Sequence, residues 1–237
     1  MNIRFKRPYN FQPRGNVGRW YEIRNMSAET AEVMIYDEIG AWGITASAFV
    51  KELDSVKAQN LDIRISSPGG DVFDGLAILN ALRSHPANKV VTVDGLAASA
   101  ASFIAMAGDK IVMSPQSMMM VHDAQGLAIG NAKDMRDLAD LLDKTSDNIA
   151  AVYSARSGRP VAEWREIMLA ETWYTDQEAV DAGLADEVLG ADEPAKTPEP
   201  VAAKATVTPV AQAVTWDDLE LDLVAIQTAL KGANRNG

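Results

Sequence analysis

A serine surrounded by very small residues is the first candidate for chemistry in this chain. The stretch "DGLAASAAS" (94–102) follows the apolar run "KVVTV" (89–93), and alanines flank Ser99 on both sides. This order predicts a buried strand, a tight turn, and a helix whose first turn contains the serine. The hydroxyl would then lie in the positive field of a helix N-terminus, where a negatively charged oxygen is stabilised. Serines also cap helices, so Ser99 alone is a weak signal.

Histidine is the second candidate, because the chain has only two. His122 ends "SMMMVH" (117–122), which we interpret as a strand, and ligands of parallel α/β sheets bind beyond the strand ends. An isolated histidine at a strand end is more often structural than catalytic. His85 lies in the turn-like "RSHPAN" (83–88), where we expect an exposed and inert side chain.

A third candidate is the glycine pair of "SSPGGD" (66–71). Pro68 fixes a bend, and Gly69 and Gly70 expose backbone N–H groups with no side chain in the way. A Pro-Gly-Gly sequence is most often only a turn. Two strand-end loops of this kind can nevertheless aim N–H groups at one point and form an oxyanion hole, in which one donor stabilises a transition state by about 3 kcal/mol.

The elements that would position these residues alternate between strand and helix. Alternating or β-branched apolar residues predict strands, and Leu76, Leu79 and Leu82 mark a helix face. The predicted strands are 32–40, 61–70, 89–93, 110–113 and 117–122, with helices at 44–56, 71–85 and 99–108. This order predicts an α/β fold of βαβ units with a mostly parallel sheet.

Longer helical patterns follow. Asn131 and Asp134 form a predicted capping box for a helix over 132–156, which Gly158 and Pro160 would end. The helix is long and polar, as expected of an arm that projects from the sheet. Thr175 and Glu178 start a second helix in the same way, and "LADEVL" (184–189) reads as a closing strand.

Composition limits the class of protein. The 237 residues carry a net charge of −11, and 47% of them are apolar. No apolar run approaches the ~18 residues of a membrane span, and no signal peptide is evident, so we expect a cytoplasmic protein. With no cysteine, disulfides, thiol chemistry and cysteine-bound zinc are excluded.

The two ends differ from the middle of the chain. Residues 1–25 hold six basic residues against Glu22, which predicts a basic N-terminal arm that is either solvated or in contact with an acidic partner. The acidic remainder argues against nucleic-acid binding. We predict a catalytic domain over 26–190, a disordered Ala/Pro-rich linker over 191–215, and a short amphipathic helix and tail over 216–237 that docks on this chain or a partner.

Four blocks in order resemble the Clp protease proteolytic subunit family, peptidase family S14. They are "ISSPGGDV", "GLAASAAS", "MMMVHDAQG" and "ETWYTDQEAVDAGLADEV", and the resemblance runs from about residue 32 to residue 189. The opening "IYDEIG", the "ETWYT" block and the extra terminal segments are most similar to the phage and prophage branch, whose members are linked to capsid maturation. The resemblance implies a ClpP/crotonase-like fold with a projecting handle helix at 132–156.

The same resemblance implies roles for site residues. Ser99 would be the nucleophile and His122 the general base, with the N–H groups of Gly69 and Ala100 as oxyanion-hole donors. Where the main family has an aspartate as the triad acid, this chain has Glu171, and Asp176 is a rival. Asp123 would point to the other face of its strand and orient the imidazole poorly.

The resemblance also implies partners. Gly70, Gln125 and Gly126 would bind substrate, and the segment 124–132 would pair with an extended polypeptide and contact an opposing ring. We expect a homo-oligomeric, stacked ring that needs no metal or cofactor. Its substrates would be peptides or capsid-assembly proteins. The protease would be ATP-independent or ATPase-assisted, and we favour action without a dedicated unfoldase.

Two alternatives stay open from the sequence. A crotonase-type acyl-CoA enzyme would also use paired backbone N–H groups, although it does not require Ser99 and His122. A catalytically silent assembly or scaffold protein could retain the same fold, and the glutamate at 171 leaves room for it.

Overall fold

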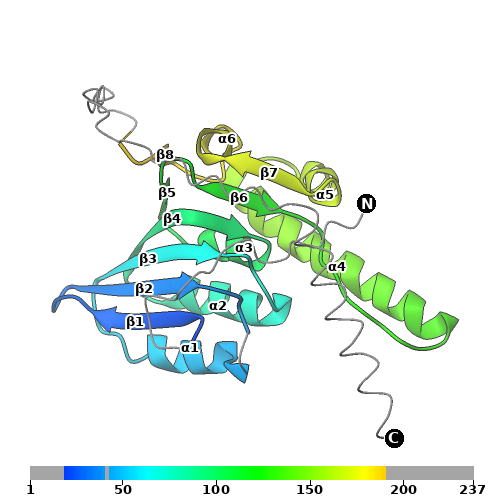
Figure 1. The fold of residues 1–237 in the computed structure, drawn as a ribbon, viewed down its shortest axis with the longest axis horizontal. Helices are drawn as coiled ribbons and strands as arrows, with labels where there is room; N and C mark the ends of the chain where they lie inside the picture. Colours follow the sequence, from blue (N-terminus) through cyan, green and yellow to red (C-terminus); the bar gives the residue numbers. More distant parts are fainter. Residues whose placement is uncertain (1–18, 41–42, 191–237) are drawn as a thin grey trace, which may run out of the picture. The chain divides into compact units, whose positions relative to one another are not determined.

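The computed structural model describes residues 19–40 and 43–190, which form a mixed sheet flanked by helices (Figure 1). The sheet order is β1-β2-β3-β4-β5-β8, and β6 pairs with both β4 and β7. The β1–β2 and β6–β7 pairs are antiparallel, and all other pairs are parallel. The predicted α/β class with a mostly parallel sheet is confirmed. The strands are β1 (Tyr21–Asn25), β2 (Thr30–Tyr36), β3 (Asn60–Ser67), β4 (Asn88–Ala98), β5 (Lys110–Met113), β6 (Met118–Val121), β7 (Thr172–Thr175) and β8 (Glu187–Val188).

One face of the sheet is more deeply buried than the other. Val33 and Ile63 are fully buried, whereas their neighbours Met34 and Arg64 remain partly exposed, as expected when one face packs on helices. The first three helices lie side by side along the buried face (Figure 1). The helices are α1 (Ala46–Leu53), α2 (Val72–Ser84), α3 (Ala100–Ala105), α4 (Ala132–Ser157), α5 (Val161–Leu169) and α6 (Asp176–Asp181).

The sheet divides along β4. Residues 90–93 of β4 pair with β5, whereas residues 96–98 pair with β6. The register of β3 against β4 also shifts between Ile65 and Ser67, and such an irregularity bends and twists a strand locally. The end of β4 therefore leaves β5 and runs beside β6, which brings the residues after both strands together.

The N-terminal boundary predicted from the sequence is wrong. Residues 21–25, assigned to a basic arm, form strand β1 antiparallel to β2. Trp20 and Tyr21 are buried, and the Trp20 ring stacks on Phe49 with centroids 5.8 Å apart. Tyr21 and Ile23 alternate toward the core, but the exposed Arg19 and Arg24 beside them led to the prediction of a basic arm. Residues 1–18 and the predicted segments 191–215 and 216–237 lie outside the described residues.

The long helix α4 forms as the capping pattern predicts. The Asn131 side chain accepts hydrogen bonds from the N–H groups of Lys133 and Asp134, and the Asp134 side chain accepts one from the Asn131 N–H. Gly158, at φ 76°, ends the helix. The first half of α4 extends beyond the sheet (Figure 1), and its second half buries Ile149 and Tyr153. The Thr175–Glu178 capping box also forms, whereas α5 and β7 were not predicted.

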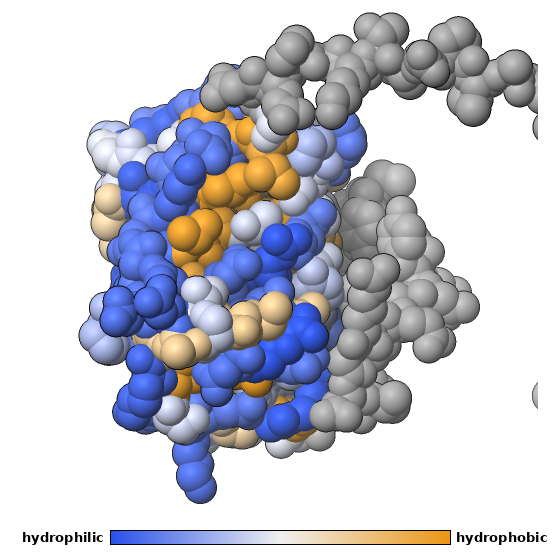
Figure 2. Space-filling view, turned by 90° about the vertical axis from the view of Figure 1, so that its left-hand side faces the viewer, coloured by the Kyte–Doolittle hydropathy of each residue, from blue (hydrophilic) through white to orange (hydrophobic). Residues whose placement is uncertain are grey.

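The surface is largely hydrophilic on the side of the β1–β2 turn. Figure 2 shows this side, on which apolar side chains gather mainly at the level of β5 and β8. Within residues 19–40 and 43–190, no helix combines the length and apolar character that a membrane crossing requires.

Candidate active site

Ser99 lies at a strained turn between β4 and α3. Its φ of 54° and ψ of −122° are values that non-glycine residues rarely adopt, at a cost of about 1–3 kcal/mol. The Ser99 N–H donates to the Met120 carbonyl of β6 at 3.0 Å. A sharp strand-to-helix turn of this kind presents a nucleophile clear of both elements. The predicted strand, turn and helix around Ser99 are confirmed.

A polar chain from α4 holds the carbonyl of the same serine. The Ser102 Oγ donates to the Ser99 carbonyl at 2.5 Å and lies 2.7 Å from the Tyr153 hydroxyl. Both side chains are buried, and burial raises the pKa of Tyr153, so its hydroxyl stays protonated and can donate. These two contacts hold the strained turn in place and offset part of the conformational free energy that the turn costs.

His122 directly follows β6 and reaches Ser99. Because Ala98 of β4 pairs with Met120 of β6, the residues just beyond both strands are neighbours. The His122 Nε2 lies 2.6 Å from the Ser99 Oγ. Burial lowers the pKa of His122, although the negative charges of Glu171 and Asp123 act in the opposite direction. The imidazole is therefore neutral near pH 7, the state in which Nε2 can accept the serine proton.

The other ring nitrogen of His122 has no acid partner. His122 Nδ1 is buried and makes no hydrogen bond within the described part of the chain. Glu171 lies opposite His122 because Val121 pairs with Thr172 in the antiparallel β6–β7 register. Its side chain is exposed and accepts only a long 3.5 Å contact from the Trp173 Nε1. The strand register thus places Glu171 near His122, but its carboxylate is not hydrogen-bonded to the imidazole.

The two rival acids face elsewhere. Asp176 lies at the far end of β7 and accepts from the Gln116 N–H at 2.8 Å. Asp123 bonds to Arg165 at 2.7 Å rather than to the neighbouring imidazole, in line with its predicted orientation. Of the three carboxylates, Glu171 and Asp123 are those whose charges act on His122.

The glycine turn packs against the serine turn. A Cβ added to Gly69 would lie 2.7 Å from the Ser99 Cβ and 2.8 Å from the Ala100 N, so this close approach requires glycine. However, the Gly69 N–H donates to the Ser67 Oγ at 3.1 Å. The expectation that Gly69 supplies a free oxyanion donor is therefore contradicted. The Gly70 N–H donates to no other described residue. Gly70 also lines a cavity beside Ser99.

A cavity of about 400 Å³ opens beside the nucleophile. It is lined by Ser99, His122, Ala100 and the three predicted substrate-binding residues Gly70, Gln125 and Gly126. Apolar side chains of α4 form its far wall, among them Leu138, Leu142 and Ile149. The residues between β6 and α4 form no strand in this chain, and Leu127 and Ile129 are 91% and 95% exposed.

A larger cavity of about 630 Å³ lies between α1 and α2, and neither Ser99 nor His122 lines it. It is lined by His85, whose Nδ1 accepts from the Ala87 N–H while Nε2 contacts the Val56 carbonyl. His85 is half-buried and structural, so the expectation of an exposed side chain is wrong. Among the described residues, no group of three or more His, Asp or Glu could hold a metal ion.

The Clp protease family model matches residues 13–192. The chain belongs to this family. It is 33% identical over 148 residues to the ATP-dependent Clp protease proteolytic subunit of Bacteroides fragilis, covering 61% of this chain and 72% of that one. It is 35% identical over 136 residues to proteolytic subunit 2 of Thermobifida fusca, covering 56% and 66%. Over 151 residues it is 32% identical to proteolytic subunit 1 of Prochlorococcus marinus, covering 61% and 77%.

Family membership makes the chain a serine endopeptidase, a hydrolase of peptide bonds. Members of the Clp protease family form oligomeric rings and work with Clp ATPases. The resemblance drawn from the four sequence blocks is confirmed at the level of the family.

Sequence reasoning missed the polar residues that support the dyad. Ser102 and Tyr153 hold the Ser99 carbonyl, and Ser146 and Arg165 hold the segment after His122. Only Ser102 carried a usable signal, since a serine three residues into a helix can reach back to the turn before it. The other contacts join distant parts of the chain.

Proposed function

We propose that Ser99 and His122 cleave peptide bonds by acyl transfer. The observation that carries this proposal is the 2.6 Å contact between the His122 Nε2 and the Ser99 Oγ at the wall of an open cavity. His122 takes the serine proton as Oγ attacks the substrate carbonyl carbon, then gives that proton to the leaving amine. Water, deprotonated by His122, then attacks the acyl-serine, the bond to Oγ breaks, and Ser99 takes the proton back from His122 as the second product leaves.

Two backbone N–H groups would hold the oxyanion, those of Gly70 and Ala100. Ala100 is the first residue of α3, so its N–H has no carbonyl acceptor within the helix. Gly70 lines the same cavity. One such donor contributes about 3–4 kcal/mol of transition-state stabilisation. Together they would act on negative charge that develops within reach of Ser99.

Glu171 would complete the triad by turning toward His122 Nδ1. The β6–β7 register supports this assignment, as does the buried and unpartnered Nδ1. Hydrogen bonds of catalytic groups are often loose without substrate and tighten in the productive complex. Substrate binding or ring assembly would supply that change here. The carboxylate would then fix the tautomer with Nε2 free and stabilise the imidazolium.

The substrate would be an extended polypeptide with an apolar side chain next to the scissile bond. The wall of Leu138, Leu142 and Ile149 supports the apolar preference. The segment 125–130, which pairs with no strand among the described residues, would offer its backbone groups for strand addition. We propose capsid-assembly proteins as the natural substrates and a stacked homo-oligomeric ring as the working form. The support is the likeness of "IYDEIG" and "ETWYT" to the phage and prophage branch.

The relatives' names include ATP dependence, whereas we propose cleavage of flexible chains without a dedicated unfoldase. The cytoplasmic location stays a prediction. The test incubates purified full-length protein with unfolded casein, with and without ATP and a Clp ATPase, beside the Ser99→Ala variant. We expect fragments from the wild type alone, in every condition. Fragments from both proteins, or from neither, would overturn the proposal, and absolute dependence on the ATPase would overturn its ATP-independent part.

A further inference from the structure

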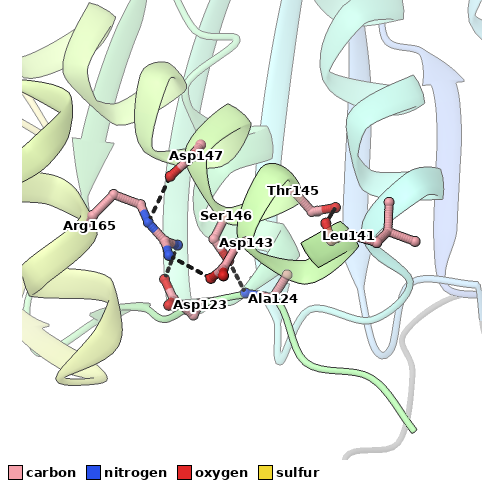
Figure 3. Close-up of polar contacts among 8 residues, drawn as sticks. All are labelled: Asp123, Ala124, Leu141, Asp143, Thr145, Ser146, Asp147 and Arg165. Carbon is pink, nitrogen blue, oxygen red and sulfur yellow. Dashed lines mark hydrogen bonds and ion pairs between the residues drawn. The ribbon is translucent and has the colours of Figure 1, made fainter. Parts of the chain in front are cut away.

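A single arginine joins three elements behind the active site. Arg165 of α5 contacts three carboxylates, those of Asp123, Asp143 and Asp147 (Figure 3). The distances are 2.7 Å from Nη1 to Asp123, 3.2 Å from Nη2 to Asp143, and 2.9 Å from Nε to Asp147. Asp143 and Asp147 lie on α4, and Asp123 directly follows His122. The guanidinium therefore connects the segment bearing the general base to both α4 and α5.

The inner contact of this cluster is more shielded than the outer two. The Arg165 and Asp123 side chains are each 22% exposed, whereas Asp143 and Asp147 are 76% and 64% exposed. Solvent weakens ion pairs between exposed groups. The Arg165–Asp123 pair is thus the one on which placement of the loop depends, and the two outer carboxylates orient the guanidinium.

The same loop is fastened at two backbone positions. The Ala124 N–H donates to the Ser146 Oγ of α4 at 2.9 Å (Figure 3). The Asp123 N–H donates to the Met168 carbonyl of α5 at 3.2 Å. Beyond these contacts the chain runs on without regular structure to Asn131. On the other side, His122 is preceded only by the four-residue strand β6. The position of the imidazole therefore depends on the contacts that hold Asp123 and Ala124.

We propose that Arg165 is a positioning residue that holds His122 against Ser99 by clamping Asp123 to α4 and α5. This inference rests on the proposed function of the dyad. Arginine suits the role because its planar guanidinium carries five N–H donors in a rigid fork. A lysine has the charge but not the fork, and cannot hold three carboxylates in this geometry.

The clamp also sets the charge beside the imidazole. The charged groups acting on His122 are Glu171 and Asp123, and both raise its pKa against the effect of burial. The pKa of Asp123 is raised, chiefly by burial and also by Asp143 and Asp147, whereas Arg165 and His122 lower it. Removing the guanidinium would leave Asp123 uncompensated and raise the pKa of His122. Removing the Asp123 charge would lower it.

The test compares Arg165→Met and Asp123→Asn in the full-length protein with a fluorogenic peptide substrate. Arg165→Met removes the clamp, and Asp123→Asn weakens it by removing the charge while keeping one acceptor oxygen. We therefore expect kcat to fall about tenfold or more in Arg165→Met and by a smaller factor in Asp123→Asn, since small misplacements of catalytic groups are costly, with little change in KM. Because the base acts in its neutral form, the acid limb of the kcat/KM profile should move to higher pH in Arg165→Met. It should move to lower pH in Asp123→Asn.

Two controls separate positioning from general damage. Lys133→Met removes a cation from an exposed α4 pair with Asp137 and should leave both kcat and the pH profile unchanged. Arg165→Lys should keep the acid limb near its wild-type position while kcat stays low. Opposite shifts of the limb are a result that loss of structure alone does not produce.

The outcomes are decisive in each case. Wild-type kcat in a folded Arg165→Met or Asp123→Asn variant would overturn the inference, and so would acid limbs that do not move apart. If Arg165→Met fails to fold, Asp123→Asn and Arg165→Lys decide by the same criteria. An inactive wild type would overturn the proposed function itself, whereas an active wild type with unaffected variants would overturn only the role of Arg165.

Discussion

The loops that carry Ser99 and Glu171 are alike in backbone but opposite in support. Both residues have positive φ, 54° and 51° respectively. The Ser99 loop is held by β6, by Ser102 and through it by Tyr153. The Glu171 side chain is exposed and makes one long contact to Trp173. The proposed nucleophile and base are therefore pre-assembled within one chain, while the side chain of the proposed acid is left free to rotate.

This difference indicates that the parts of the site need different precision of placement. The parts that must be placed to a fraction of an ångström, Ser99 and His122, lie beyond strands whose pairing is fixed. In the proposed triad, Glu171 would act through the imidazole and would therefore tolerate a looser attachment until substrate or ring assembly orders it. The predictions below concern variants on the Ser99 side of the site and a variant of Glu171.

The largest effect is expected from Gly70→Ala. At φ 152°, an added Cβ would lie 2.0 Å from the Ile39 carbonyl oxygen, so the turn must shift and displace the N–H that we propose as an oxyanion donor. We expect kcat to fall about 10²- to 10³-fold and the melting temperature to fall with it. Gly43→Ala is the matched control, because Gly43 also has positive φ, at 73°, but no neighbour within 4 Å. Steady-state kinetics and thermal melting check both.

A smaller effect is expected from Glu171→Gln. The glutamine keeps the size of the side chain but removes the charge that would stabilise the imidazolium. Since the carboxylate does not contact His122 in this structure, we expect kcat to fall about 10- to 100-fold, less than the about 10⁴-fold typical of a preformed triad acid. Asp176→Asn serves as the control, and kcat is measured for both. A larger loss in Asp176→Asn than in Glu171→Gln would reverse the assignment.

The smallest effect is expected from Tyr153→Phe. It removes one buried hydrogen bond, to Ser102, but leaves the bond from Ser102 to the Ser99 carbonyl intact. We expect a loss of about 1–2 kcal/mol in the free energy of unfolding, measured by denaturant titration, and nearly unchanged kcat. A large loss of activity without loss of stability would mean that the support from α4 is needed for the chemistry itself.

The comparison also explains what the sequence could predict. Ser99, His122 and the capping residues Asn131 and Thr175 carry local signals, because strand ends and helix starts have their own residue preferences. The choice between Gly69 and Gly70 was beyond such signals, since it depends on where the Ser67 hydroxyl points. Strand β1 was missed because its residues were grouped with the basic residues before them, as part of one arm over 1–25.

Contacts between distant segments were also beyond prediction. Arg165 meets partners 22 and 42 residues away in the chain, and no spacing rule links them. The position of Glu171 followed from aligning a motif, whereas its lack of contact with His122 depends on a side-chain conformation. Local chemistry thus predicted that Ser99 and His122 lie at neighbouring strand ends, and tertiary packing determined which residues hold them there.

The most direct test of the account is the intact mass after treatment with a serine-directed fluorophosphonate. The account predicts one adduct on the wild type, none on Ser99→Ala, and greatly slowed labelling of His122→Ala, because only a serine activated by its imidazole reacts rapidly. An adduct of equal rate and extent on the Ser99→Ala variant, or none on an assembled wild type, would contradict it.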